Sequence, residues 1–377
     1  MGAAPTARVV IAAAGTGGHI YPGLALAEAL RAADPGVVVS FVGTRRGLES
    51  DIMQREGYEL DFVDMVPFAG ANRYVLPGAL LRASDQARRL LRRRSADVAV
   101  GMGGYASAPL LIGARLARLP SLIHESGAIP GKANLLAARF TRQVATAFPS
   151  AAARFPGQQR TVRVTGMPLA REFGHFDRDA LRASAREQLG LPPDKFVLFV
   201  MGGSQGATRL STAAIELGAR WRDRDDLHIL LKLGARAGAE IDEQIADAGA
   251  DKVVHRVAYL DRMDTAYAAA DAALCRAGAG TVAELAVTGL PAVLVPYPFA
   301  TGDHQRENAV ELADAGGALI VPDAEATADV LGPTFEEWAD NPAELQRRAE
   351  AAASVGHPHA ARELAAWVLD LARRRRG

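Results

Sequence analysis

The chain has 377 residues, about half of them hydrophobic, and its 43 Lys and Arg residues balance 43 Asp and Glu residues. This length favours two domains, and the charge balance argues against a protein whose main partner is nucleic acid. A single cysteine, Cys275, excludes a disulfide framework and a zinc site built on paired cysteines. The first apolar run is too short for a signal peptide, and no run reaches the roughly 18 residues of a membrane span, so we expect a soluble, intracellular protein.

Short β-branched runs alternate with longer helical patterns along the whole chain, which predicts α/β domains with parallel sheets and crossover helices. In chain order, the first predicted strands are 9–13, 37–42, 60–63, 98–100, 121–124, 143–146 and 162–165. The helices predicted between them include 22–33, 76–93 and 108–116. The scheme restarts with the predicted strands 196–201, 228–232, 253–257, 272–275, 292–295 and 319–321.

A second strand–glycine–helix opening in the middle of the chain indicates a second Rossmann-like half. We therefore expect an N-terminal domain over residues 1–165 and a C-terminal domain over 192–350, joined by a crossover over 166–191. The last segment, 351–377, is rich in alanine and arginine. It predicts a helix that packs back on the N-terminal domain.

Four glycine-rich loops each follow a predicted strand, at 15–19, 101–109, 202–207 and 275–285. Glycine lets the backbone approach a ligand closely, and the helix that follows points its first N–H groups at an anion. One such loop is often only a tight turn. Four of them, at the strand ends where α/β sheets bind ligands, indicate one or two phosphate-bearing ligands in the cleft between the halves.

The fourth loop, "CRAGAGTVAEL", allows two interpretations. In the first, Thr281 is a helix N-cap and Glu284 completes a capping box. In the second, Glu284 accepts hydrogen bonds from ribose hydroxyls while the helix N-terminus binds a diphosphate. The spacing alone does not choose between them.

The motifs taken together resemble the MurG family of UDP-GlcNAc:lipid I N-acetylglucosaminyltransferases. The resemblance covers nearly the whole chain and rests on "GTGGHIYPGLALAEAL", "GMGGYASAP", "HESGAIPGKAN", "GMP", "GGSQGA", "YLDRM", "CRAGAGTVAEL", "GLPAVLVPYP" and "DHQRENA", in that order. It implies a GT-B fold, with two Rossmann-like domains facing a central cleft. It also implies an inverting transfer of GlcNAc from UDP-GlcNAc to lipid I, giving lipid II for peptidoglycan synthesis.

The resemblance also assigns roles to individual residues. The acceptor side would comprise Thr16, Gly17, Gly18, Gly103, Gly104, Tyr105 and Glu125. The donor side would comprise Arg171, Ser204, Gln205, Leu260, Gly278, Ala279, Thr281, Glu284, His304 and Gln305. Within this set Leu260 matches the residue that reads uracil, Glu284 the one that binds ribose, and Gln305 the one that reads the sugar hydroxyls.

Three positions depart from the family pattern: Ala14 replaces a glycine, Gly127 replaces an asparagine, and Ala170 displaces an arginine to Arg171. All three lie on the acceptor side or in the crossover. They leave open a related transferase that acts on another lipid-phosphate sugar, such as a phosphoglycolipid.

His19 is the candidate catalytic base, because an imidazole with a pKa near 6.5 suits proton abstraction near neutral pH. A helix start should also disfavour its protonated form. Two alternatives stay open: that His19 positions the acceptor, or that it is structural. The departing UDP would be met by helix N-termini, with Arg171 or Arg276 as further candidates. The sequence demands no metal, although stimulation by a divalent cation stays open.

An apolar stretch flanked by arginine, residues 66–94, predicts docking of the protein on an anionic membrane surface once a lipid-linked acceptor is assumed. This candidate membrane patch comprises Phe68, Tyr74, Leu76, Leu80, Leu81, Arg82 and Arg89. The plainer alternative is an amphipathic crossover helix with a charged outer face. With the patch, we expect a peripheral protein on the cytoplasmic face of the plasma membrane.

Two other function classes compete with the transferase. A nucleotide-dependent oxidoreductase or epimerase predicts G-x-G-x-x-G with a later acidic residue, whereas the first loop is "GTGGH" and the second predicted strand ends in "GTR". A non-catalytic sugar-nucleotide binding module is disfavoured by His19 and by the full set of donor motifs.

Overall fold

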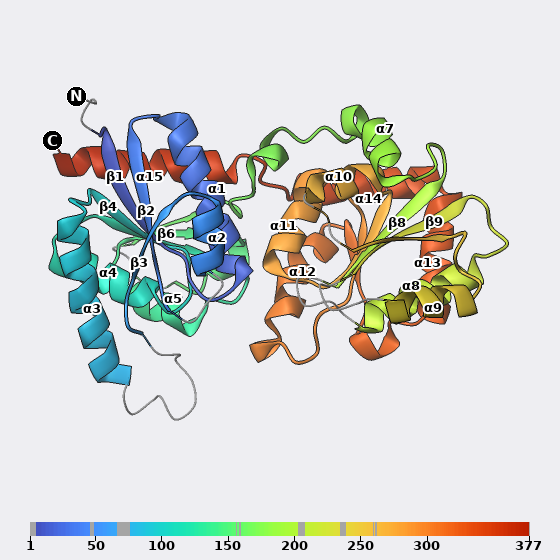
Figure 1. Cartoon of the computed structure of the whole chain (residues 1–377), viewed down its shortest axis with the longest axis horizontal. Helices are drawn as coiled ribbons and strands as arrows, with labels where there is room; N and C mark the ends of the chain where they lie inside the picture. The colour runs from blue at the N-terminus through green and yellow to red at the C-terminus, as the bar shows by residue number, and fades with distance from the viewer. Residues whose placement is uncertain are drawn as a thin grey trace. The chain divides into compact units, whose positions relative to one another are not determined.

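The computed structural model describes residues 5–45, 49–65, 76–155, 157, 160–202, 208–233, 239–258, 260 and 262–376. It divides into two compact units. The N-terminal unit comprises Met1–Gly174 and His357–Gly377, and the C-terminal unit comprises His175–Gly356. Each unit has its own parallel sheet with helices on both faces (Figure 1).

The N-terminal unit contains a seven-stranded parallel sheet with the order β3-β2-β1-β4-β5-β6-β7. Its strands are β1 (Ala7–Ala12), β2 (Val37–Gly43), β3 (Glu59–Phe62), β4 (Val98–Gly101), β5 (Ser121–Glu125), β6 (Gln143–Thr146) and β7 (Thr161–Val164). Its helices are α1 (Gly17–Ala33), α2 (Glu49–Arg55), α3 (Leu76–Arg93), α4 (Ser107–Leu116), α5 (Lys132–Ala137), α6 (Pro149–Ala152) and α15 (Ala360–Arg376).

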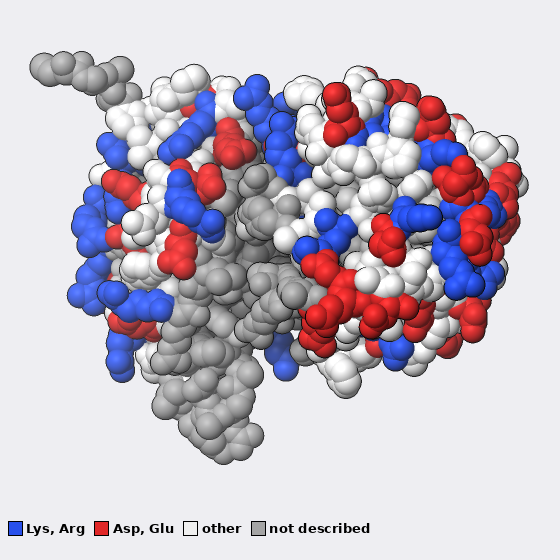
Figure 2. All heavy atoms as spheres, turned by 45° about the vertical axis from the view of Figure 1, so that its right-hand side comes forward, with Lys and Arg blue, Asp and Glu red and all other residues white. Residues whose placement is uncertain are grey.

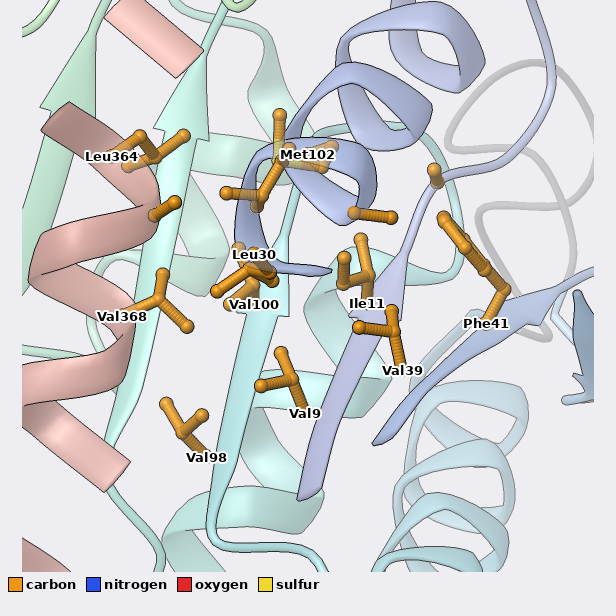
Figure 3. Packing of buried hydrophobic residues seen from close by; sticks show 14 of the residues in the cluster. Val9, Ile11, Leu30, Val39, Phe41, Val98, Val100, Met102, Leu364 and Val368 are labelled. Carbon is orange, nitrogen blue, oxygen red and sulfur yellow. The ribbon is translucent and has the colours of Figure 1, made fainter. Parts of the chain in front are cut away.

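The central strand β1 is buried on both faces, which explains why its sequence is continuously apolar. Val9 and Ile11 belong to the core on one face, and Val10 belongs to the core on the other. The C-terminal helix α15 closes the first face, where Leu364 and Val368 point toward the strands (Figure 3). A segment from the far end of the chain is therefore part of the N-terminal core.

The C-terminal unit repeats the scheme with six parallel strands in the order β10-β9-β8-β11-β12-β13. These are β8 (Phe196–Met201), β9 (Leu227–Lys232), β10 (Val254–Val257), β11 (Ala272–Cys275), β12 (Ala292–Leu294) and β13 (Ala318–Ile320). Its helices are α7 (Arg178–Leu189), α8 (Thr208–Arg220), α9 (Ala239–Asp247), α10 (Met263–Ala269), α11 (Ala279–Thr288), α12 (His304–Asp314), α13 (Ala328–Asp340) and α14 (Pro342–Ser354).

In both sheets the strand order reverses beside the first strand of the unit. β1 lies between β2 and β4, and β8 lies between β9 and β11. Open α/β sheets bind ligands at the carboxyl ends of the strands beside such a switch point. The segments that follow β1 and β4, and those that follow β8 and β11, therefore frame the candidate sites.

Every strand expected from the sequence is present within one residue of its predicted bounds, except that β1 begins two residues earlier than expected. Two further boundaries differ. Helix α1 begins at Gly17 and not at Pro22, so Pro22 lies inside the helix, where it has no N–H to donate to the carbonyl four residues earlier. The expected crossover over 166–191 is divided between the units, since α7 packs against α10 and so belongs to the C-terminal unit.

Candidate functional site

The first glycine loop is a short turn followed by a helix start. Gly15 has φ +98°, a conformation that favours glycine, and Thr16 is the N-cap of α1. Gly17, Gly18 and His19 therefore form the first helical turn. By helix geometry, the N–H groups of Gly17 and Gly18 have no acceptor within the helix. The turn thus offers the anion-binding backbone that the sequence predicts.

A buried carboxylate that the sequence analysis did not single out fixes this turn. Glu49 accepts the Gly15 N–H through Oε2 (3.3 Å), and it accepts the Thr44 N–H (2.9 Å) and hydroxyl (3.1 Å) through Oε1. Its side chain is completely buried. Nothing in the local pattern distinguishes Glu49 from a surface glutamate at a helix start, so only the fold reveals its role.

The second glycine loop packs directly on the first. A Cβ atom at Gly103 (φ +103°) would lie 2.4 Å from His19 Cδ2, and one at Gly104 (φ +76°) would lie 2.1 Å from the Ala14 carbonyl oxygen. Both positions therefore require glycine for space as well as for conformation. Ser107 stabilises the loop, because its Oγ accepts the Gly103 N–H at 2.9 Å and donates to the Gly103 carbonyl at 2.6 Å.

The predicted acceptor residues of the first two glycine loops are thus brought together at the switch point between β1 and β4. Tyr105 extends from the same loop and is 37% exposed. Thr16 places its Oγ1 3.4 Å from Nδ1 of His19.

The surroundings of His19 favour the neutral form of its imidazole. Burial lowers its pKa, and a hydrogen bond to the Ala14 carbonyl opposes this shift. A ring N–H therefore donates to that carbonyl and selects one tautomer. A neutral ring of fixed tautomer has the form that a general base needs.

A second histidine, His124, is completely buried and lies near the first. Its Nε2 is 3.0 Å from the Gly166 carbonyl oxygen, and its Nδ1 is 3.3 Å from Ser126 Oγ. Burial lowers the pKa of His124 to about 4, the Gly166 bond opposes the shift, and the charge of His19 lowers the pKa further. The two imidazoles therefore disfavour each other's protonation.

Glu125 shapes the loop that follows β5. Its carboxylate accepts the N–H groups of Gly127 (2.9 Å) and Gly131 (3.0 Å) and the side-chain amide of Asn134 (2.9 Å). Burial raises the pKa of Glu125, and these donors oppose the rise. The carboxylate is thus engaged with its own loop, and its direct contact with an acceptor stays a prediction.

The structure of the fourth glycine loop decides between a capping box and a ligand-binding role for Glu284. Helix α11 begins at Ala279 with Gly278 as its N-cap, and the first intrahelical bond runs from the Val282 N–H to the Gly278 carbonyl at 2.9 Å. Thr281 is therefore inside the first turn, and the capping-box interpretation is wrong. Glu284 lies in the second turn, too far along the helix to reach back to the cap.

The Glu284 carboxylate instead accepts a hydrogen bond from the neighbouring helix α10. Tyr267 on α10 donates its hydroxyl to Glu284 Oε2 at 2.6 Å, and the carboxylate remains partly exposed. The first turn of α11 carries no acidic residue and is rich in small side chains, "AGT". An anion-binding helix start and a fixed carboxylate therefore lie side by side on one helix.

Comparison with known proteins identifies the family. Residues 9–146 match the sequence profile of the glycosyltransferase family 28 N-terminal domain, and residues 197–364 match that of the family 28 C-terminal domain. The chain belongs to glycosyltransferase family 28. The resemblance inferred from the motifs is thereby confirmed, and the oxidoreductase or epimerase interpretation is set aside.

Relatives extend over nearly the whole length of this family 28 chain. A UDP-N-acetylglucosamine–N-acetylmuramyl-(pentapeptide) pyrophosphoryl-undecaprenol N-acetylglucosamine transferase of Mycolicibacterium vanbaalenii is 40% identical over 98% of this chain and 91% of its own. The enzyme of the same name from Clavibacter sepedonicus is 41% identical over 96% and 95%. The crystal structure of Acinetobacter baumannii MurG matches with a TM-score of 0.78 and 29% identity, over 97% of this chain and 99% of that one. The GT-B fold expected from the resemblance is thus confirmed.

Among the remaining predicted donor residues of this glycosyltransferase, the structure describes His304, Gln305 and Leu260. Gln305, in the first turn of α12 beside His304, accepts the Tyr297 N–H at 2.9 Å and so anchors the loop after β12. Leu260 lies shortly before α10 and is partly buried. Ser204 and Gln205 lie outside the described residues.

Two arginines considered for the leaving group have other contacts. Arg276 donates to the carbonyls of Val295 (3.1 Å) and Pro296 (3.3 Å) and pairs with Asp323 at 2.5 Å, which ties β11 to its neighbours. Arg171 is exposed, belongs to the N-terminal unit and lies near Glu28. Burial raises the pKa of Glu28, and Arg171 is among the charges that act on it.

The candidate membrane patch needs a correction. Helix α3 forms as predicted, but Leu76 and Leu80 pack against the core of the N-terminal unit, because they lie on the apolar face of the helix. Leu81 is 73% exposed beside the exposed Arg82, whereas Arg89 pairs with Asp85. Phe68 and Tyr74 lie outside the described residues.

Within the described residues, no helix combines the length and apolar character that crossing a membrane requires. The same residues hold no cluster of three or more His, Cys, Asp or Glu side chains arranged to bind a metal ion. Figure 2 shows basic and acidic side chains interspersed on one face of the protein, in agreement with the balanced composition.

Proposed function

We propose that this chain transfers GlcNAc, with inversion, from UDP-GlcNAc to lipid I, giving lipid II. The observation that carries the proposal is the arrangement on α11, where Glu284, hydrogen-bonded by Tyr267, follows a helix start that no side chain caps. This arrangement suits a ribose diphosphate, and the relatives of similar length are named for this transfer. The N-terminal unit supplies a second glycine-lined edge, which suits the acceptor's diphosphate.

In the proposed mechanism His19 removes the proton from the acceptor hydroxyl as that hydroxyl attacks the anomeric carbon. Its lowered pKa and its hydrogen bond to Ala14 support this role. The negative charge that develops on the departing UDP is stabilised by the first-turn N–H groups of α11. No metal is needed in this scheme, so activity should survive chelation with EDTA. Loss of activity that returns with a divalent cation would contradict this part of the proposal.

A transfer assay tests the function directly. Radiolabelled UDP-GlcNAc is offered with a lipid I analogue and, in parallel, with other polyprenyl-phosphate sugars. We expect product with the lipid I analogue, and a loss of about 100-fold or more in kcat for His19→Ala. His359→Ala, which removes an exposed histidine from the same unit, is the matched control. Product only with another lipid-phosphate sugar would move the assignment to that acceptor.

We further propose that the protein acts as a peripheral protein on the cytoplasmic face of the plasma membrane, where lipid-linked acceptors are displayed. Exposed Leu81 beside Arg82 supports contact with anionic lipid. Vesicles with and without phosphatidylglycerol should pellet the protein in a lipid- and salt-dependent way. Leu81→Ser should weaken pelleting, whereas Leu116→Ser, at another exposed leucine of the same unit, should not. Equal behaviour of the two variants would refute this site.

A further inference from the structure

A fully buried tyrosine supports the carboxylate of the proposed donor site. Tyr267 lies on α10, is 0% exposed, and donates its hydroxyl to Glu284 Oε2 at 2.6 Å. Its ring packs edge-on against Phe199 of β8, with ring centroids 5.8 Å apart. Packing thus fixes the ring, and the ring fixes the position of the hydroxyl beneath Glu284.

The surroundings of this pair are the carboxyl ends of three neighbouring strands. Met201 ends β8, Lys232 ends β9 and Cys275 ends β11. The Tyr267 hydroxyl lies 3.9 Å from Met201 Sδ. Burial lowers the pKa of Lys232 and raises that of Cys275, and the charge of Glu284 raises both. Glu284 therefore lies at the carboxyl ends of these strands, where an α/β sheet of this order binds its ligand.

A carboxylate on a helix surface ordinarily samples several rotamers and is hydrated on both oxygens. Here a buried donor approaches one oxygen from the protein side, in a short hydrogen bond to a charged group, which is stronger than one between neutral groups. Glu284 is partly exposed. A ligand diol then meets a carboxylate whose direction is already set, so less ordering is needed on binding.

We propose that Tyr267 is a positioning residue for nucleotide recognition: it orients Glu284 so that the carboxylate distinguishes a ribose diol from a sugar without these hydroxyls. The inference rests on the proposed function, because it assumes that Glu284 faces the ribose of UDP-GlcNAc. It adds a residue that does not touch the ligand and that acts through Glu284.

The test compares the binding of UDP and of 2′,3′-dideoxy-UDP to the full chain by calorimetry. We expect Tyr267→Phe to weaken UDP binding about tenfold and to leave dideoxy-UDP binding unchanged, so the ratio of the two dissociation constants falls by about tenfold. Adding Tyr267→Phe to Glu284→Ala should change the ratio no further. Phenylalanine keeps the packed ring, and water can reach the partly exposed Glu284, so the variant should fold.

Phe335→Leu is the matched control, because it removes another buried edge-on ring contact of the same unit, that with Trp338, and leaves Tyr267 and its packing intact. It should lower the melting temperature and keep the ratio. If Tyr267→Phe keeps the wild-type ratio, or weakens both nucleotides equally, the positioning role is wrong while the donor site stands. If the wild type binds UDP and dideoxy-UDP equally well, Glu284 does not recognise the ribose diol, and the inference is wrong as well. If the wild type does not bind UDP, the proposed function itself fails.

Discussion

The contact between the two glycine loops of the N-terminal unit makes a sharp prediction for Gly103→Ala. The added methyl would lie 2.4 Å from His19 Cδ2 and 2.8 Å from Nε2, so the imidazole must move. The residue also has φ +103°, which costs a residue with a Cβ about 1–2 kcal/mol. Forcing His19 off its rotamer adds about 0.5–1.5 kcal/mol. We therefore expect the free energy of unfolding to fall by about 2–3 kcal/mol.

The variant Gly15→Ala separates the cost of the backbone conformation from the cost of moving His19. Gly15 has nearly the same φ, +98°, but its added methyl would meet nothing within 4 Å. It should show the backbone cost of about 1–2 kcal/mol without the displacement of His19. The difference between the two variants in urea unfolding then measures the clash with the histidine.

The activity of Gly103→Ala should fall further than its stability loss explains. A catalytic group displaced by about 1 Å loses roughly 100-fold in rate, so kcat should drop by that order at a temperature where the variant is folded. UDP affinity, which we assign to the C-terminal unit, should stay unchanged. A Gly103→Ala protein that turns over at the wild-type rate would refute the placement of the base at His19.

The other predictions concern titration and buried charge. Because burial lowers the pKa of His19 below 6.5, the base stays neutral in mild acid, and the acid limb of kcat/KM should lie below pH 6.5; a limb above that value would contradict the assignment. The pKa of His124 is about 4 in the folded protein and about 6.5 when unfolded, so stability should be lost as pH falls from 6.5 toward 4, by about 3 kcal/mol, and His124→Gln should flatten this dependence in urea titrations. Asp271 pairs with three arginines of α7, one of which, Arg186, is 1% exposed, so Asp271→Asn should cost about 3–5 kcal/mol. Asp85→Asn, at a surface pair on α3, should cause no measurable change; equal effects of the two aspartate variants would refute the argument.

The fold could be predicted from the sequence because the central strands of both sheets are buried on both faces. Such strands are short apolar runs bounded by glycine or charge, and "FVLFVM" and "AALC" match β8 and β11 residue for residue. Helix starts were harder. Gly17, Gly18 and His19 have poor helix propensity, so local preference favoured a loop, whereas tertiary packing of α1 extends the helix back to them.

Likewise, part of the candidate site could be predicted from the sequence and part could not. Motifs located His19, the two glycine loops and Glu284, because these residues follow strands within a few positions. Glu49, Ser107 and Tyr267 support the site through contacts over distances that no local pattern encodes. The capping-box alternative failed for a related reason: the spacing of Thr281 and Glu284 fits it, but the helix starts two residues before Thr281.

The two units use the same edge of the same kind of sheet, and each places a helix start there, but the titratable side chain beside it differs. In the N-terminal unit, burial lowers the pKa of His19 and of His124, and the nearby N–H groups of α1 disfavour a positive charge. In the C-terminal unit, the helix start of α11 favours an anion, while Glu284 is set back by more than one turn and held by Tyr267. A carboxylate in the first turn would compete with a diphosphate for the same N–H groups. Its displacement to the second turn therefore lets one short helix bind a phosphate at its end and a diol on its side.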